Sequence, residues 1–214
     1  MSLFRLDPRD DVDSFMDDNY SLFTSSYESR IDDLESNIKY SIVVNKEASK
    51  QHYENIMSIS DVFGNVNMIQ IDLLTVGYYL LYEKRVLPKM YFARQLALLI
   101  YEELKSFERF RGTFRKALKQ NDNDSFIDSL KKQSEENKNK AIKFDARYKD
   151  YLGKIRHATI AHRNPYFEKQ INIMMETDPY VIFGLSMKFE LIINDLNDIL
   201  KSYLSRFVVG SVNL

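Results

Sequence analysis

The sequence of 214 residues contains no cysteine and no tryptophan, and it has only three histidines, four prolines and six glycines. The absence of cysteine excludes disulfide bonds and thiolate metal sites, and it suits a reducing compartment. So few glycines and prolines argue against a sandwich or barrel, whose many turns need these residues, and favour helices joined by short turns. No segment approaches the run of about 18 apolar residues that a membrane helix needs.

The N-terminal segment also lacks the features of a targeting sequence. Residues 1–18 are acidic and are interrupted by Pro8, unlike a secretory signal or a transit peptide. We therefore expect a cytoplasmic protein without a membrane segment. We expect one helical domain over residues 1–214, with residues 1–18 as a flexible arm and the very polar residues 131–140 as an exposed helical stretch or a mobile loop.

Apolar residues recur at helical spacing along most of the chain. Three such stripes occur. The first begins near Ser21, the second lies in the middle of the chain, and the third, with nearly heptad spacing, lies towards the C-terminus. This periodicity is typical of amphipathic helices. The stripes comprise Tyr27, Ile31, Leu34, Ile38 and Ile42; Ala93, Leu96, Ala97, Ile100, Leu104 and Phe107; and Leu185, Phe189, Ile192, Leu196, Ile199 and Tyr203. The sequence predicts an all-α protein, an antiparallel bundle of about five to seven helices. The near-heptad helix needs a straight partner, either a core helix or its own copy in another protomer.

Several residues mark where these helices begin and end. Gly64 and Asn65 suggest a turn before a strongly apolar helix over residues 66–82. Pro88 suits the first turn of the next helix. Ser125 with Asp128 resembles a capping box, and Asp178 before a proline signals the start of the last helix.

The net charge of −1 conceals a gradient along the chain. Residues 1–104 have a net charge of −7, residues 105–163 of +8 and residues 164–214 of −2. Concentrated positive charge can attract a phosphate backbone, but a solvated lysine-rich helix face has the same composition.

Basic residues alternate with phenylalanines between residues 105 and 119. Such a pattern can hold phosphates and stack bases, and it is equally typical of a half-buried helix whose arginines run their stems along the core. The candidate RNA-binding residues are Arg109, Arg111, Arg115 and Lys116.

Two of the three histidines lie in one short segment, residues 151–165, together with two arginines. On a helix, Arg156 and His162 flank the apolar seam of Leu152, Ile155 and Thr159, whereas His157 points about 140° away from His162. Outside this segment, Glu103 lies close to the buried side of its own helix. It is either a boundary carboxylate with its head in water or an acidic partner for a buried arginine.

The spacing of these residues excludes several kinds of site. Zinc-binding helices place histidines four residues apart with a glutamate between them, whereas His157 and His162 are five apart with no acidic residue between them. We expect no metal and no other cofactor. No nucleophile elbow and no phosphate-binding glycine loop occurs in the sequence.

Histidine and arginine together can cleave a phosphodiester without metal. A neutral imidazole accepts the proton of a ribose 2′-OH and an imidazolium protonates the leaving oxygen, while a guanidinium stabilises the phosphorane. Dependence on the 2′-OH makes RNA the substrate. Since each chain offers one histidine on the seam, a two-fold dimer would supply the second.

The segment Arg156-His157-x-x-x-x-His162 resembles the signature of the HEPN superfamily, an arginine followed by four to six residues and a histidine. The resemblance implies a small helical bundle and a homodimeric, metal-independent ribonuclease of the toxin–antitoxin or abortive-infection kind, with an antitoxin protein as a further partner. Arg156 and His162 would be catalytic and His157 the polar motif residue. We expect Thr159, Arg163, Asn164 and Glu103 to be supporting residues of this site.

Two alternatives remain open. Some HEPN proteins are non-catalytic, so the chain is alternatively a helical RNA-binding or protein-interaction module. Arg156 and His162 can also cap or pair near a helix C-terminus, where positive charge is favoured.

Overall fold

The computed structural model describes residues 20–119, 124–160, 172 and 176–212. Its long helices are α2 (Tyr20–Lys50), α3 (Glu54–Tyr82), α4 (Val86–Leu118), α5 (Ser125–Ile160) and α7 (Pro179–Val212). The described ranges contain no strand. This confirms the predicted all-α fold and the expected number of helices.

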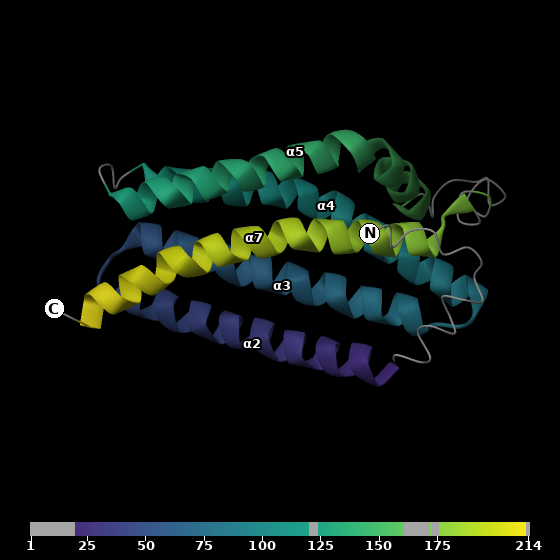
Figure 1. Ribbon diagram of the computed structural model, residues 1–214, viewed down its shortest axis with the longest axis horizontal. Coiled ribbons are helices and arrows are strands. Elements are labelled where there is room, and N and C mark those ends of the chain that lie inside the picture. The colour runs from purple at the N-terminus through teal and green to yellow at the C-terminus, as the bar shows by residue number, and fades with distance from the viewer. Residues whose placement is uncertain (1–19, 120–123, 161–171, 173–175, 213–214) are drawn as a thin grey trace.

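The helices form an elongated bundle in which successive helices run in opposite directions (Figure 1). α7 packs against α3, α4 and α5, and α2 covers α3. The near-heptad stripe of α7 is buried along its whole length, from Leu185 to Tyr203. The straight partner that this stripe requires is therefore supplied by core helices of the same chain.

The turn between α2 and α3 lies at residues 51–53, and the turn predicted at Gly64 is wrong. His52 provides the reversal with a φ of 57°, and α3 continues through Gly64 without interruption. A Cβ at Gly64 would lie 2.9 Å from the Oγ of Ser41 on α2. The glycine therefore allows two helices to approach closely, which requires no turn.

The starts of the later helices follow the sequence signals with one change. Pro88 lies in the first turn of α4, and the Asp178 carboxylate accepts a hydrogen bond from the backbone N–H of Tyr180 at 2.8 Å. α5 begins at Ser125, but Asp124 caps it, since its carboxylate accepts from the N–H of Phe126 at 2.9 Å. An aspartate one residue earlier thus performs the role predicted for Ser125.

Residues 131–140 are helical and belong to the interior of α5. One residue of this polar segment is buried. Asn137 is 1% exposed, and its Nδ2 donates a hydrogen bond to the backbone carbonyl of Ile192 on α7 at 2.7 Å. Of the two expected forms of this segment, the helical one is the form observed.

A band of polar side chains crosses the otherwise apolar core between α2, α3 and α7. Asn67 and Asn197 are both buried, and the Nδ2 of Asn67 donates to the Oδ1 of Asn197 at 2.9 Å. Asn37 adds a 3.0 Å hydrogen bond to the Oδ1 of Asn67. Buried amides of this kind favour one register of the helices, because any shift would leave them unpaired.

None of the described helices combines the length and apolarity that crossing a membrane would require.

Candidate functional site

Arg156 lies near the end of α5, where the helix packs against α4. Leu152 and Ile155 are buried in the core, and they place Arg156 at the edge of the α4–α5 contact. Its side chain is 26% exposed. The guanidinium is therefore held by the protein and still accessible from outside.

Two residues of α4 contact this arginine, and a third contacts both of them. The Nε of Arg156 donates a hydrogen bond to the Oε1 of Glu102, and its guanidinium lies over the ring of Tyr101, 5.3 Å from the centroid. The Nζ of Lys105 lies 3.2 Å from the other carboxylate oxygen of Glu102 and 4.6 Å from the Tyr101 centroid. We call Tyr101, Glu102, Lys105 and Arg156 the Arg156 cluster.

Gly153 allows α4 and α5 to approach each other beside this cluster. A Cβ on Gly153 would lie 3.4 Å from the Tyr101 ring, at the tight limit of ordinary contact. The two helices are therefore close at this point, and the glycine costs about 1 kcal/mol relative to alanine in a helix interior.

The two adjacent glutamates of α4 have different environments. The hydrogen bond from Arg156 is the main reason that the pKa of Glu102 lies below its usual value. Burial raises the pKa of Glu103, whose neighbouring groups are Ser106, Asp72 and Arg109. The acidic partner of the arginine is thus Glu102, and Glu103 is a partly buried carboxyl that faces other groups.

The other motif residues lie at or beyond the end of the described helix. His157 is exposed on α5. Thr159 is in the last turn of α5, with its side chain outside the described residues, as are His162, Arg163 and Asn164. Of the two predicted catalytic residues, the structure therefore describes Arg156, and His162 lies outside the described residues.

In comparisons with protein-family models, curated proteins and solved structures, nothing matches this chain. The resemblance to the HEPN superfamily accordingly rests on the motif residues alone.

The four candidate RNA-binding residues of α4 divide into two groups. Arg109, Arg115 and Lys116 are exposed, whereas the side chain of Arg111 is only 7% exposed. Arg111 lies over the Phe107 ring at 5.4 Å, with its stem along the core. The sequence pattern could not separate these residues, because the outcome depends on which side of α4 meets α5.

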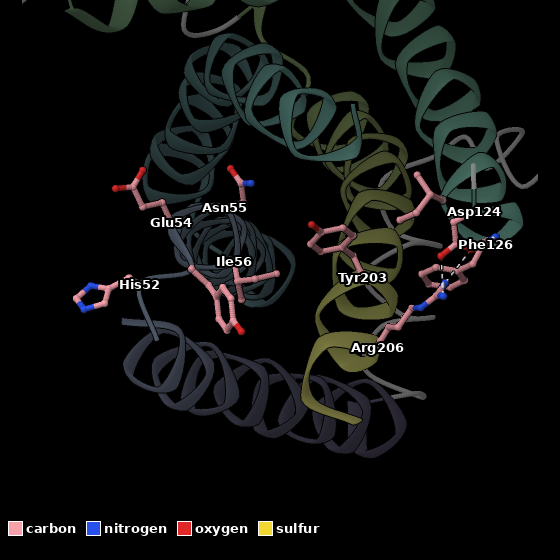
Figure 2. Close-up of a pocket in the computed structure, with 10 residues that line it drawn as sticks. His52, Glu54, Asn55, Ile56, Asp124, Phe126, Tyr203 and Arg206 are labelled. Carbon is pink, nitrogen blue, oxygen red and sulfur yellow. Dashed lines mark hydrogen bonds and ion pairs between the residues drawn. The ribbon is translucent and has the colours of Figure 1, made fainter. Parts of the chain in front are cut away.

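A hollow of about 730 Å³ lies between the start of α3, the start of α5 and the C-terminal part of α7 (Figure 2). It is lined by His52, Tyr203 and the ion pair of Arg206 with Asp124, in which Nη2 lies 2.6 Å from Oδ2. None of the residues lining it is a predicted site residue. Size alone therefore does not make this hollow the functional site.

The described residues contain no group of three or more His, Asp or Glu side chains arranged to hold a metal ion.

Proposed function

We propose that this chain is a metal-independent endoribonuclease in which Arg156 and His162 act on the scissile phosphate of RNA. The observation that carries the proposal is the accessible Arg156 near the end of α5, held by Glu102 and Tyr101 of α4. A guanidinium fixed in this way loses little conformational freedom when a phosphate binds.

The chemistry assigns one role to each side chain. The imidazole of His162 takes the proton of the 2′-OH, the 2′-oxygen attacks phosphorus, and an imidazolium returns a proton to the departing 5′-oxygen. Arg156 stabilises the charge that develops on the phosphorane. The products are a 2′,3′-cyclic phosphate and a free 5′-OH.

His162 follows Arg156 by six positions, which corresponds to about 9 Å along a helix. A homodimer with its motifs facing each other would place two histidines around one phosphate, and it is part of the proposal. An antiviral or toxin role, held in check by an antitoxin protein, is the biological setting that the motif suggests.

The ion pair with Glu102 also favours a second candidate, a non-catalytic module that binds RNA or a protein. A carboxylate that already neutralises the arginine competes with a phosphate. Binding by such a module would weaken with added salt if phosphates are contacted, and it would not require His162.

The test is incubation of the protein with a mixed RNA substrate in EDTA, followed by analysis of the new 3′ ends. We expect cyclic phosphate ends from the unmodified chain and a loss of about 100-fold or more in rate for His162→Ala. The matched control is His52→Asn, an exposed histidine at the opposite end of the bundle whose positive φ asparagine tolerates.

Cleavage that survives His162→Ala, or that EDTA abolishes, would contradict the mechanism. A monomer at micromolar concentration in light scattering would contradict the composite site. RNA binding without cleavage in the unmodified chain and in His162→Ala would favour the non-catalytic module.

A further inference from the structure

A second site is formed by the buried guanidinium of Arg111 between α4 and α5. Its Nη2 contacts Glu108, whereas Nε and Nη1 are buried and find no hydrogen-bond acceptor in the described part of the chain. An arginine that is 93% buried with two nitrogen donors unpaired is unfavourable for folding. A buried polar group without a partner requires an explanation, and a bound ligand that supplies the missing acceptor is one.

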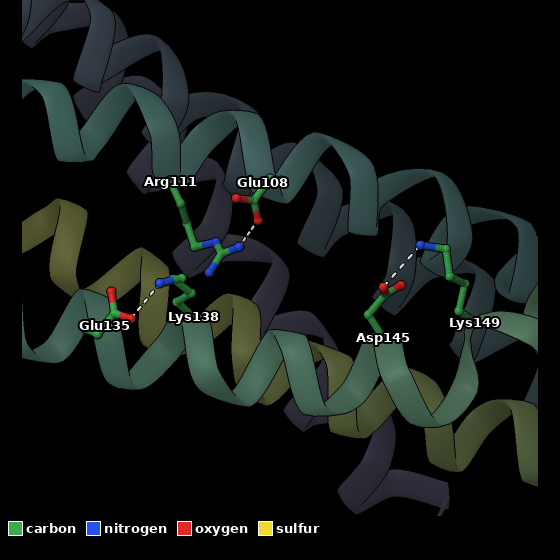
Figure 3. Close-up of polar contacts among 6 residues, drawn as sticks. All are labelled: Glu108, Arg111, Glu135, Lys138, Asp145 and Lys149. Atoms are coloured by element: carbon green, nitrogen blue, oxygen red, sulfur yellow. Dashed lines mark hydrogen bonds and ion pairs between the residues drawn. The ribbon is translucent and has the colours of Figure 1, made fainter.

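Arg111 lines a cavity of about 330 Å³ that α4 and α5 enclose together. Figure 3 shows the side chain of Arg111 extending from α4 towards α5, with Asp145 and Lys149 further along α5. The cavity volume is at the lower end of the range for small-molecule sites. Its apolar wall is formed by Leu104, Phe107, Ala141, Ile142 and Ala146.

The charged groups that line the cavity besides Arg111 are Lys105, Lys149, Glu108 and Asp145. Both lysines are more than half exposed and pair with carboxylates at 3.2 Å, Lys105 with Glu102 and Lys149 with Asp145. Exposed pairs within one helix contribute little free energy. Each lysine can therefore leave its carboxylate for a ligand in the cavity at small cost.

Glu108 is the group that the ligand would displace. It contacts Arg111 from three positions earlier on the same helix, and its side chain is 73% exposed. Nε and Nη2 form one edge of a guanidinium, the edge that binds oxyanions with two parallel hydrogen bonds. Once Glu108 swings into solvent, a pair of phosphate oxygens can accept from this edge, which pairs the orphan Nε and leaves Nη1 as the one donor without an acceptor in the described part of the chain.

We propose that this cavity binds a small phosphate monoester, with its phosphate on Arg111, Lys105 and Lys149 and its apolar body against the wall formed by Leu104 and Ile142. Three cations suit a dianion better than a monoanion. The proposal does not depend on ribonuclease activity, although Tyr101 and Lys105 belong both to this cavity and to the Arg156 cluster.

The experiment measures binding of phenyl phosphate, inorganic phosphate and benzoate by calorimetry, with thermal unfolding as a second measurement. We expect phenyl phosphate to bind more tightly than benzoate, which has the same ring but one charge, and than inorganic phosphate, which has no apolar body. Arg111→Met should weaken phenyl phosphate binding about tenfold or more, as expected for loss of a charged hydrogen bond.

The neighbouring variants sharpen the test. Glu108→Gln should tighten binding, because the competing carboxylate is gone, and Lys149→Gln should weaken it by about two- to fivefold. Arg147→Gln is the matched control, since this arginine of α5 is exposed and does not line the cavity, and the affinity of this variant should stay within about twofold of the unmodified chain.

The melting temperature distinguishes an arginine that binds a ligand from one that only stabilises the fold. Without ligand, Arg111→Met should raise the melting temperature, because it removes a buried charge with unpaired donors, and phenyl phosphate should stabilise only the chain with Arg111. A lower melting temperature for Arg111→Met, with no binding to the unmodified chain, would overturn the proposal. So would Arg111-dependent binding of an oligoribonucleotide without binding of phenyl phosphate, which would make the cavity part of an RNA groove.

Discussion

Glu190 is a partly buried carboxylate on α7, in a hollow that α2 and α3 also line. Burial raises its pKa, and the charge of Arg30 offsets this effect only in part. The Nη2 of Arg30 donates instead to the Oδ1 of Asn194. The carboxylate therefore remains only partly compensated at neutral pH.

This environment makes the stability of the protein depend on pH at one residue. Because the pKa of Glu190 is higher in the folded than in the unfolded chain, its ionised form opposes folding at neutral pH, and the cost disappears as the pH falls through the raised pKa. We expect Glu190→Gln to increase the free energy of unfolding at pH 7 by about 0.5–1 kcal/mol and to have little effect near pH 4. Urea unfolding at both pH values measures this.

Asp198→Asn on the same helix is the matched control, since Asp198 is exposed, and it should leave stability nearly unchanged. Equal stabilisation by Glu190→Gln at both pH values would contradict the electrostatic explanation.

At the scale of single helices, two glycines illustrate what the sequence can and cannot predict. Gly64 and Gly112 both lie inside long helices. A Cβ at Gly64 would lie 2.9 Å from the Oγ of Ser41, whereas a Cβ at Gly112 would meet nothing within 4 Å. Ser41 has little freedom to move, because it is buried and its Oγ donates to the carbonyl of Ser60 at 2.6 Å.

The same substitution should therefore have opposite effects at the two positions. Gly112→Ala should stabilise the protein by about 0.5–1 kcal/mol through helix propensity. Gly64→Ala should destabilise it by about 1 kcal/mol, because overpacking between helices outweighs that gain. Thermal unfolding of both variants measures the difference. A stabilising Gly64→Ala would show that α2 can move away from α3 at little cost.

Helix existence could be predicted from the sequence because the apolar stripes carry a local signal. The starts at Pro179 and Ser125 came from cap residues, which are also local. The turn predicted at Gly64 is wrong because the sequence alone does not distinguish a glycine in a turn from a glycine that lets two helices pack closely; the position of the neighbouring helix decides this. For the same reason, the sequence placed Arg156 on a helix but could not identify Glu102 and Tyr101, whose contact depends on the register of α4 against α5.

At the scale of the whole molecule, α7 holds the bundle together. α2, α3, α4 and α5 each pack against the next helix along the chain, and α7 adds contacts to α3 and α4, which come much earlier in the sequence. It contributes the fully buried Leu196 and Phe189 to the centre of the core. Asn197 adds the α7 side of the polar band.

Because α7 follows α2, α3, α4 and α5 in the sequence, it is synthesised after them and can pack against them only at the end of synthesis. Synthesis proceeds at about 5–20 residues per second, so the 34 residues of α7 take roughly 2–7 s to add. During this interval the apolar surfaces of α3, α4 and α5 that pack against α7 in the folded protein remain exposed to solvent. We expect ribosome-bound chains stalled before Pro179 to be cut rapidly within α4 and α5 in pulse proteolysis, and chains with α7 fully emerged to resist; equal resistance would show that four helices suffice. A newly made chain therefore passes through several seconds in which chaperones and other unfolded chains compete with its own last helix for the same surface.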